Sequence, residues 1–354
     1  MGQSLALDAG CRLVNMEFMQ MMPGYISPAY QTIFNEKTFR FTRLRCPDGR
    51  PLLNEAAKEL LTQRSTHGPF TSRLPSKAVD LALFRAFLKD ERGVEATYTE
   101  EMRSDPPEFV KTYFDWLQEA RGLTMEDPIH IGIFAHAANG GIKTDPNAFT
   151  GVPGLFAAGE TAGGNPNKFV GGCCAEGKLA ARGAVAYMEG LDLPPLDEAQ
   201  VKGEMERVYA PLLSRDEEGI RPVEMKERLQ RLMDEYAGGI SQFYRTNEER
   251  LDYALRHIAV LQSQFRYLRA TDSHELMQAM ETIDRVDVAE AVVHHLKARK
   301  ETRWAGWQTR SDYPERDDAH FDCFIESRRD PATGEVSTFT RPYEQIIPGD
   351  RHTA

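Results

Sequence analysis

The chain has 354 residues, 41% of them hydrophobic, and its 54 acidic and 43 basic residues give a formal net charge of −11 at pH 7. This composition predicts a folded, soluble protein of two or three domains, and it disfavours general binding to nucleic acid or anionic membranes, which need a basic face. No apolar run approaches the roughly 20 residues that cross a bilayer, and no signal peptide is recognisable. The five cysteines lack C-x-x-C spacing, so we expect no metal site and reduced thiols in the cytoplasm.

Residues 1–23 predict a short helix from Gln3 to Ala9, which Gly10 ends, and then a strand. No G-x-G-x-x-G motif follows a predicted strand anywhere in the chain. That placement is what lets the motif hold a dinucleotide pyrophosphate, so the sequence contains no pyrophosphate-binding loop of this kind.

Residues 24–128 mix short aromatic strands with helices expected at 55–63, 76–89 and 107–121. Asp105 precedes two prolines and Glu108, a pattern typical of an N-cap followed by a first helical turn. The apolar run that begins at Ile129 ends at His136, and Asn139-Gly140-Gly141 predicts a hairpin turn.

The stretch from Gly151 to Val185 is the most informative part of the chain. Leu155–Ala158 predicts a buried strand that ends in a loop rich in Gly and Asn, and a helix is expected from Gly171-Gly172 onward. A helix N-terminus with free N–H groups suits an anionic or electron-rich ligand. An ordinary Gly-rich turn between a strand and a helix is the alternative, but a run of this length favours a ligand site.

Two further regions complete the chain. Apolar residues recur at helical spacing between about residue 215 and residue 299, which predicts a helical bundle. From residue 301 the sequence becomes aromatic and typical of strands, with a turn at Asp330-Pro-Ala-Thr-Gly334.

The Gly151–Val185 run resembles the second flavin-contacting segment of the fumarate reductase and succinate dehydrogenase flavoprotein family. Its variant Lys168-Phe169, followed by Gly-Gly and Ala-Glu-Gly-Lys-Leu-Ala-Ala, and the tail Arg341-Pro-Tyr-Glu-Gln-Ile-Ile-Pro are similar to the adenylylsulfate reductase α-subunit branch. The resemblance implies FAD as cofactor and a mixed α+β / α/β fold. Its expected parts are the end of a first FAD-domain segment (1–23), an α+β capping domain (24–128), a second FAD-domain segment (129–192), a helical domain (193–300) and a C-terminal β-containing extension (301–354).

The same resemblance assigns cofactor contacts to the glycine-rich run. Gly159 and Glu160 would close the strand, with Glu160 binding ribityl or ribose hydroxyls, and the backbone from Gly171 and Gly172 to Ala175 would touch the flavin ring. The vicinal Cys173 and Cys174 fall in this stretch. Small packing residues at a tight helix start explain them more simply than redox activity does.

Substrate contacts are implied at two further places. His136 matches the family's substrate-gripping histidine, with a structural histidine as the alternative. The proton-delivering arginine is best matched by Lys77, or by Arg73 one turn earlier, and either residue could equally be a surface cation. Asp48 stands where the family has a relay glutamate, but Pro-Asp-Gly favours a simple turn.

The resemblance therefore implies part of an FAD-dependent oxidoreductase that exchanges a hydride between flavin N5 and a small anion, with a carboxylate preferred because Met19–Tyr25 contains no arginine. The alternatives are an adenylylsulfate reductase α subunit with a ferredoxin-like iron–sulfur partner, and an inactive fragment that serves in assembly. The missing N-terminal FAD-binding half would belong to the same gene product or to a separate chain. Without it, we expect the isolated chain to be inactive.

Overall fold

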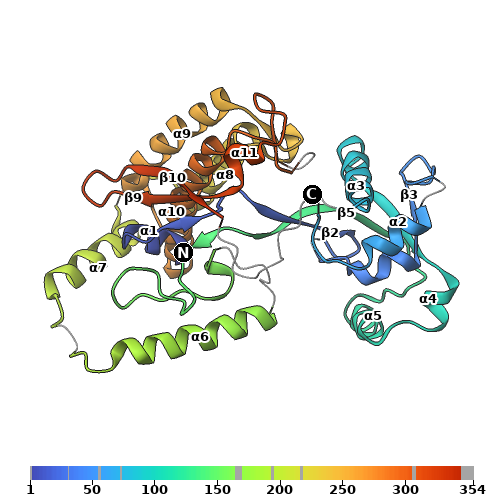
Figure 1. The fold of residues 1–354 in the computed structure, drawn as a ribbon, viewed down its shortest axis with the longest axis horizontal. Helices are drawn as coiled ribbons and strands as arrows, with labels where there is room; N and C mark the ends of the chain where they lie inside the picture. The colour runs from blue at the N-terminus through green and yellow to red at the C-terminus, as the bar shows by residue number, and fades with distance from the viewer. Residues whose placement is uncertain are drawn as a thin grey trace. The chain divides into compact units, whose positions relative to one another are not determined.

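A computed structural model describes residues 2–30, 32–54, 57–71, 74–163, 170–192, 195–215, 218–304 and 308–343. The chain divides into two compact units (Figure 1). We call Met19–Ala137 the insert unit, and Met1–Phe18 together with Ala138–Arg351 the main unit. The functional roles that the sequence assigns to parts of these units remain predictions.

The insert unit contains a four-stranded sheet in the order β2-β5-β4-β3. Its strands are β2 (Met19–Ser27), β3 (Thr42–Arg45), β4 (Val94–Tyr98) and β5 (Ile129–Ala138). The central strand β4 runs antiparallel to both β3 and β5, with Val94 opposite Ile131 and Tyr98 opposite Thr42. Alternate residues of β4, namely Val94, Ala96 and Tyr98, are buried, because successive side chains of a strand point to opposite faces of the sheet.

The helices of the insert unit are η1 (Glu36–Phe41), α2 (Ala57–Arg64), α3 (Lys77–Lys89), α4 (Glu100–Ser104) and α5 (Glu108–Arg121). The sequence predicted α2, α3 and α5 within two residues of these bounds. The cap at Asp105 was wrong: Asp105 follows α4 as its C-cap, and α5 begins after Pro107, which has no side chain to cap it. The short helix α4, for which no helix was predicted, therefore directly precedes the predicted cap.

A second four-stranded sheet, in the order β10-β9-β1-β6, lies in the main unit. It consists of β1 (Leu13–Val14), β6 (Gly141–Ile142), β9 (Cys323–Arg329) and β10 (Val336–Pro342). The predicted turn between β9 and β10 is confirmed by the Gly334 N–H, which donates to the Asp330 carbonyl at 2.8 Å. The predicted hairpin at Asn139–Gly141 was wrong, because β6 pairs with β1 and not with the preceding strand.

The helical bundle of the main unit is formed by α8 (Pro222–Tyr236), α9 (Glu248–Ser263) and α10 (Ser273–Ala298), which lie side by side in Figure 1. Their shared core includes Leu229, Ile258 and Val286, as the helical spacing predicted. The remaining elements of this unit are α1 (Gly2–Asp8), η2 (Gly159–Thr161), α6 (Val170–Met188), α7 (Glu198–Leu213), η3 (Ile240–Gln242), β7 (Arg245–Thr246), η4 (Phe265–Tyr267), β8 (Thr309–Arg310) and α11 (Asp318–Phe321).

A buried ionic network joins α10 to the segment that follows β1. The Arg299 Nε donates to Glu17 Oε1 at 2.6 Å, and Arg299 Nη1 donates to Glu301 at 3.0 Å. His295 Nδ1 lies 3.1 Å from Glu17 Oε2, and its Nε2 lies 2.9 Å from the Ser327 hydroxyl. Although burial opposes ionisation of Glu17, the hydrogen bond from His295 and the charge of Arg299 lower its pKa. This network ties three distant segments of the sequence together in the main unit.

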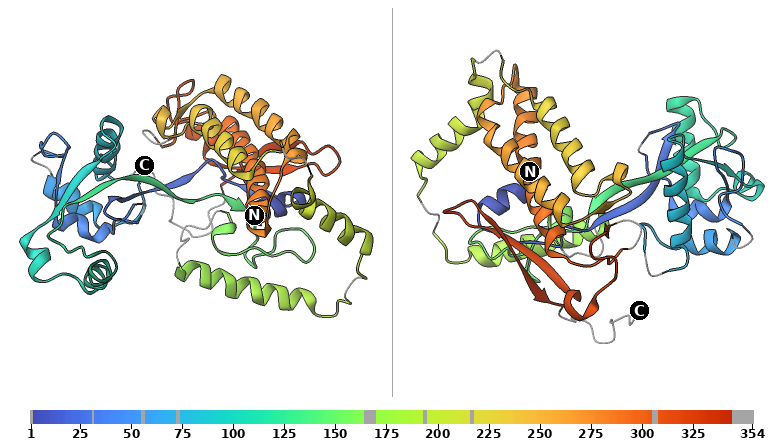
Figure 2. Two further views of the ribbon diagram at one scale, coloured as in Figure 1. Left: turned by 180° about the vertical axis from the view of Figure 1, so that it is seen from behind. Right: turned by 90° about the horizontal axis from the view of Figure 1, so that it is seen from above.

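Helix α6 differs from the bundle helices because none of its 19 residues is buried. Figures 1 and 2 show it at the margin of the main unit. Gly183 lies against the Asn147 carbonyl, and Tyr187 stacks on Phe149, but the opposite face exposes apolar residues, including Val185 and Met188. Despite this apolar character, none of the helices described has an apolar stretch long enough to cross a membrane.

Candidate functional site

The start of α6 and the short helix η2, which contain the residues predicted to bind the cofactor, lie in the main unit. The Gly159 N–H donates to Glu176 Oε2 at 2.7 Å. Gly159 has φ = +73°, a conformation that glycine adopts at no steric cost, and a Cβ there would lie 3.6 Å from Cys173. The structure therefore brings Gly159 and Cys173 together, as the sequence implied, and adds Glu176 as the residue that holds them.

The first turn of α6 presents its backbone openly. Gly171, Cys174 and Ala175 are exposed, Gly172 and Cys173 are half-buried, and a Cβ on Gly171 would meet no atom within 4 Å. The first N–H groups of a helix have no intrahelical partner and favour electron-rich ligands. An exposed glycine beside such donors lets a flat ring approach the backbone, so these residues fit the flavin that the sequence implied. Glu160 is also exposed, one residue beyond Gly159.

The expected strand at Leu155–Ala158 is not formed. Phe156 makes only an isolated bridge to Phe149, and the chain then enters η2. Gly151 and Gly154 both have positive φ, and the Thr150 hydroxyl donates to the Leu155 carbonyl at 2.9 Å. Because of this tight turn, too few extended residues remain to form the repeated hydrogen bonds of a pair of β-strands.

Backbone segments pack closely together next to η2. A Cβ on Gly140 would lie 2.5 Å from the Asn15 carbonyl oxygen, and one on Gly141 would lie 2.3 Å from the Thr161 carbonyl oxygen. A Cβ on Gly163 would likewise clash with Val14 at 2.5 Å. Only glycine allows the segments around β1, β6 and η2 to approach this closely, which explains the Gly140-Gly141 pair that the sequence suggested was a turn.

Two of the residues predicted to contact the substrate, His136 and Lys77, are described, and both lie in the insert unit. His136 is exposed near the end of β5, and within the described part of the chain its imidazole forms no hydrogen bond. Lys77 is exposed at the first position of α3. Arg73 lies outside the described residues. Asp48 is exposed and accepts hydrogen bonds from the Arg50 backbone and guanidinium, as the turn interpretation expected.

A buried polar cluster beneath Lys77 escaped sequence analysis. The fully buried Arg64 donates from Nε to Asp80 at 2.8 Å and from its other nitrogens to the carbonyls of His67 and Gly68. Ser76, directly before Lys77, has its hydroxyl 2.9 Å from His67 Nε2 and its N–H 2.8 Å from Gln63 Oε1. Burial raises the pKa of Asp80 and lowers the pKa of His67. The cluster fixes the start of α3, and the only sequence signal for it was a charged residue on the inner face of a helix.

The imidazole of His67 can be assigned a tautomer from its partners. Its Nδ1 lies 3.0 Å from the Pro69 carbonyl oxygen, which can only accept a hydrogen bond. Nδ1 therefore carries the proton in neutral His67, and Nε2 accepts from the Ser76 hydroxyl. This arrangement orients Ser76 at the start of the helix that carries Lys77.

Comparison with known proteins matches two family models to different parts of the chain. A model described as "FAD binding domain" matches residues 1–174, and one described as "Fumarate reductase flavoprotein C-term" matches residues 226–347. The first confirms FAD as the expected cofactor.

Individual relatives agree with these models. The chain is 30% identical to adenylylsulfate reductase subunit alpha of Megalodesulfovibrio gigas over 227 residues, which cover 60% of this chain and 34% of that one. It is 28% identical to a fumarate reductase flavoprotein subunit of Mycobacterium tuberculosis over 356 residues, 90% of this chain and 58% of that one. Adenylylsulfate reductase from Archaeoglobus fulgidus matches the fold with a TM-score of 0.75 at 27% identity, covering 97% of this chain and 61% of its own.

The structural match confirms the expected fold class, a mixed α/β flavoprotein fold. The chain spans less than two thirds of the length of each of these relatives.

Proposed function

Because this chain belongs to the fumarate reductase and succinate dehydrogenase flavoprotein family, we propose that it forms the C-terminal part of an FAD-dependent oxidoreductase. When bound, the flavin supplies hydride chemistry at N5, while the protein binds and orients the reactants. In this proposal Glu160 and the α6 start hold the cofactor, and His136 anchors an anionic substrate.

The observation that carries the proposal is the open first turn of α6. Its exposed glycine lies in the helix that the Gly159–Glu176 hydrogen bond holds against η2, so the backbone donors of this turn have a fixed direction before any ligand binds. Such preorganised donors stabilise charge without having to reorient. To test it, the complete flavoprotein, with the segment that carries a pyrophosphate loop, should be purified and its absorbance recorded. Absence of a flavin spectrum from the complete protein would contradict the proposal.

The exposed apolar face of α6 supports a partner for this chain. A helix that is apolar around most of its surface is normally buried, yet α6 buries no residue. We propose that the dinucleotide-binding half, in the same gene product or in a separate chain, covers this face and completes the FAD site. An iron–sulfur protein similar to ferredoxin is the proposed electron partner. The five cysteines are free, which fits the reducing cytoplasm.

For the substrate, we propose a small carboxylate. An exposed histidine can donate a charge-assisted hydrogen bond to a carboxylate when protonated, and Lys77 or Arg73 would supply the proton. The absence of arginine from Met19–Tyr25 does not discriminate between a carboxylate and adenylylsulfate as substrate, because residues 20–25 are buried within the insert unit. The proposal therefore depends on His136.

Reduction of adenylylsulfate is the second candidate, favoured by the similarity to adenylylsulfate reductase chains. The complete protein should be assayed with unsaturated dicarboxylates and a low-potential dye, and in parallel with adenylylsulfate. Turnover of a dicarboxylate well above that of adenylylsulfate supports the first candidate. Comparable or faster formation of sulfite from adenylylsulfate would establish the second one instead.

A further inference from the structure

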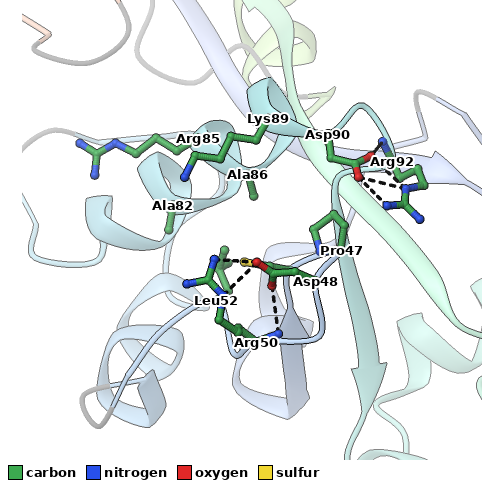
Figure 3. A pocket seen from close by; sticks show the side chains of 11 residues that line it. Pro47, Asp48, Arg50, Leu52, Ala82, Arg85, Ala86, Lys89, Asp90 and Arg92 are labelled. Atoms are coloured by element: carbon green, nitrogen blue, oxygen red, sulfur yellow. Dashed lines mark hydrogen bonds and ion pairs between the residues drawn. The ribbon is translucent and has the colours of Figure 1, made fainter.

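A pocket of about 400 Å³ lies in the insert unit, between the turn that follows β3 and the C-terminal half of α3 (Figure 3). Its volume is within the range of small-molecule sites. The helix α3 begins at Lys77 and ends at Lys89. Lys77 is not among the residues that line the pocket, and the first lining residue on α3, Ala82, lies five residues or roughly 7.5 Å further along the helix.

The charges that line this pocket do not cancel. Two of its carboxylates are each held by an arginine two residues further on: Asp48 Oδ2 accepts from Arg50 Nη2 at 2.6 Å, and Asp90 Oδ2 accepts from Arg92 Nη2 at 2.5 Å. These hydrogen bonds lower the pKa of Asp48 and bring that of Asp90 to about 2, so both carboxylates are ionised and neutralised by their own arginines.

Two cations in the pocket lining have no charge partner among the residues that the structure describes. Within the described residues, neither Arg85 nor Lys89 has a hydrogen bond or an ion pair, and both are exposed. They stand four residues apart, so they lie on the same face of α3. In Figure 3 Lys89 extends from α3 above the Asp48–Arg50 pair, which lines the opposite wall, and Arg85 extends sideways from the same helix. A lysine in the last turn also complements the helix dipole, but this effect does not account for Arg85 one turn earlier.

The rest of the lining is apolar and small. Ala82 and Ala86 lie on α3 beside the two cations, and Pro47 and Leu52 face them from the turn. Alanines at these positions leave open space, which larger side chains would fill. The pocket therefore combines a pair of positive charges with an apolar surface of ligand size.

We propose that this pocket binds a small organic dianion of the phosphate-ester class, with its phosphate on Arg85 and Lys89 and its apolar group against Ala82 and Leu52. The planar guanidinium of Arg85 can form two parallel hydrogen bonds to phosphate oxygens, and Lys89 supplies a second point charge. The site is separate from the oxidoreductase proposal and holds whether or not the chain binds flavin.

The test uses phenyl phosphate as the probe and calorimetric titration of the full chain. We expect binding with a dissociation constant below about 1 mM, weakened by added salt, as for any contact between exposed charges. The double variant Arg85→Ala/Lys89→Ala should weaken it at least roughly tenfold, because it removes two charge-assisted contacts. The matched control, Lys111→Ala/Arg121→Ala, removes two exposed cations from α5 in the same unit and should leave the affinity unchanged.

A second variant tests the apolar half of the site. Ala82→Phe should block phenyl phosphate while retaining the weak binding of inorganic phosphate, and an unchanged thermal melt would show that the fold is intact. Equal affinities for phenyl phosphate and inorganic phosphate would overturn the role of the apolar wall. No saturable binding of phenyl phosphate, or equal loss in the α5 control, would overturn the site itself.

Discussion

At the residue scale, His136 offers the most direct test of the proposed function. Its imidazole is exposed and forms no hydrogen bond to the described residues, so His136→Ala should leave the melting temperature unchanged. In the complete enzyme the variant should lose one charge-assisted hydrogen bond to the substrate, about 1.5–3 kcal/mol, or roughly 10- to 150-fold in kcat/KM. Steady-state kinetics measure this loss, and His320→Ala, another exposed histidine, serves as the control. Unaltered kinetics would return His136 to a structural role.

Lys77 is expected to act in proton transfer. In the complete enzyme, Lys77→Ala should abolish turnover of the carboxylate, while Lys77→Arg should retain part of it with a shifted pH profile, because arginine stays protonated across the accessible range. The flavin spectrum should be the same in both variants. Full activity of Lys77→Ala would transfer the role to Arg73, which Arg73→Ala would then test.

At the element scale, the Glu17–His295–Arg299 network determines how α10 is attached to the segment after β1. Arg299→Met should destabilise the main unit by about 3–5 kcal/mol, because the buried Glu17 loses its guanidinium partner, although Glu301 keeps its ion pair with Arg303. Urea unfolding followed by circular dichroism measures this change. Arg207→Met breaks an exposed pair on α7 and should have no resolvable effect. Equal effects of the two variants would show that the network contributes nothing beyond an ordinary surface pair.

The same network predicts a dependence of stability on pH. The pKa of Glu17 is lowered in the folded protein, so its stabilising contribution is complete above the unfolded value of about 4.3 and is lost as pH falls through the folded value. The difference in melting temperature between the parent and Glu17→Gln should therefore be constant from pH 7 to pH 5 and should narrow below about pH 4. The control Glu204→Gln, at an exposed ion pair, should show no such narrowing. A constant Glu17→Gln difference across the whole range would contradict this assignment.

Elements with strong periodicity were predictable from sequence, and those that depend on distant partners were not. The bundle helices and the β9–β10 turn follow from local patterns, since apolar spacing and the Asp330–Gly334 turn residues need no tertiary information. The pairing of Gly141 with β1 requires knowing that the two backbones touch. For the same reason the sequence predicted a flavin segment at Gly151–Val185 but did not identify Glu176, whose hydrogen bond depends on Gly159 lying opposite it.

At the scale of the whole molecule, the chain should bind FAD poorly by itself. The sequence has no pyrophosphate loop of the dinucleotide-binding type, and α6 presents only one side of a cofactor site. Titration of the isolated chain with FAD should give a dissociation constant no tighter than micromolar, about −8 kcal/mol. Adding the complementary half should tighten it. Nanomolar binding by the isolated chain would show that the site is complete without a partner.

The junction between the two units has a practical consequence. The Asn139 N–H donates to the Phe18 carbonyl at 2.9 Å, so the residues that flank Met19–Ala137 meet side by side in the main unit. If a short glycine-containing turn replaced Met19–Ala137, it would have to span only the short distance between Phe18 and Asn139. The same junction could accept a foreign domain whose ends are equally close, which would make this chain a host for domain transplantation.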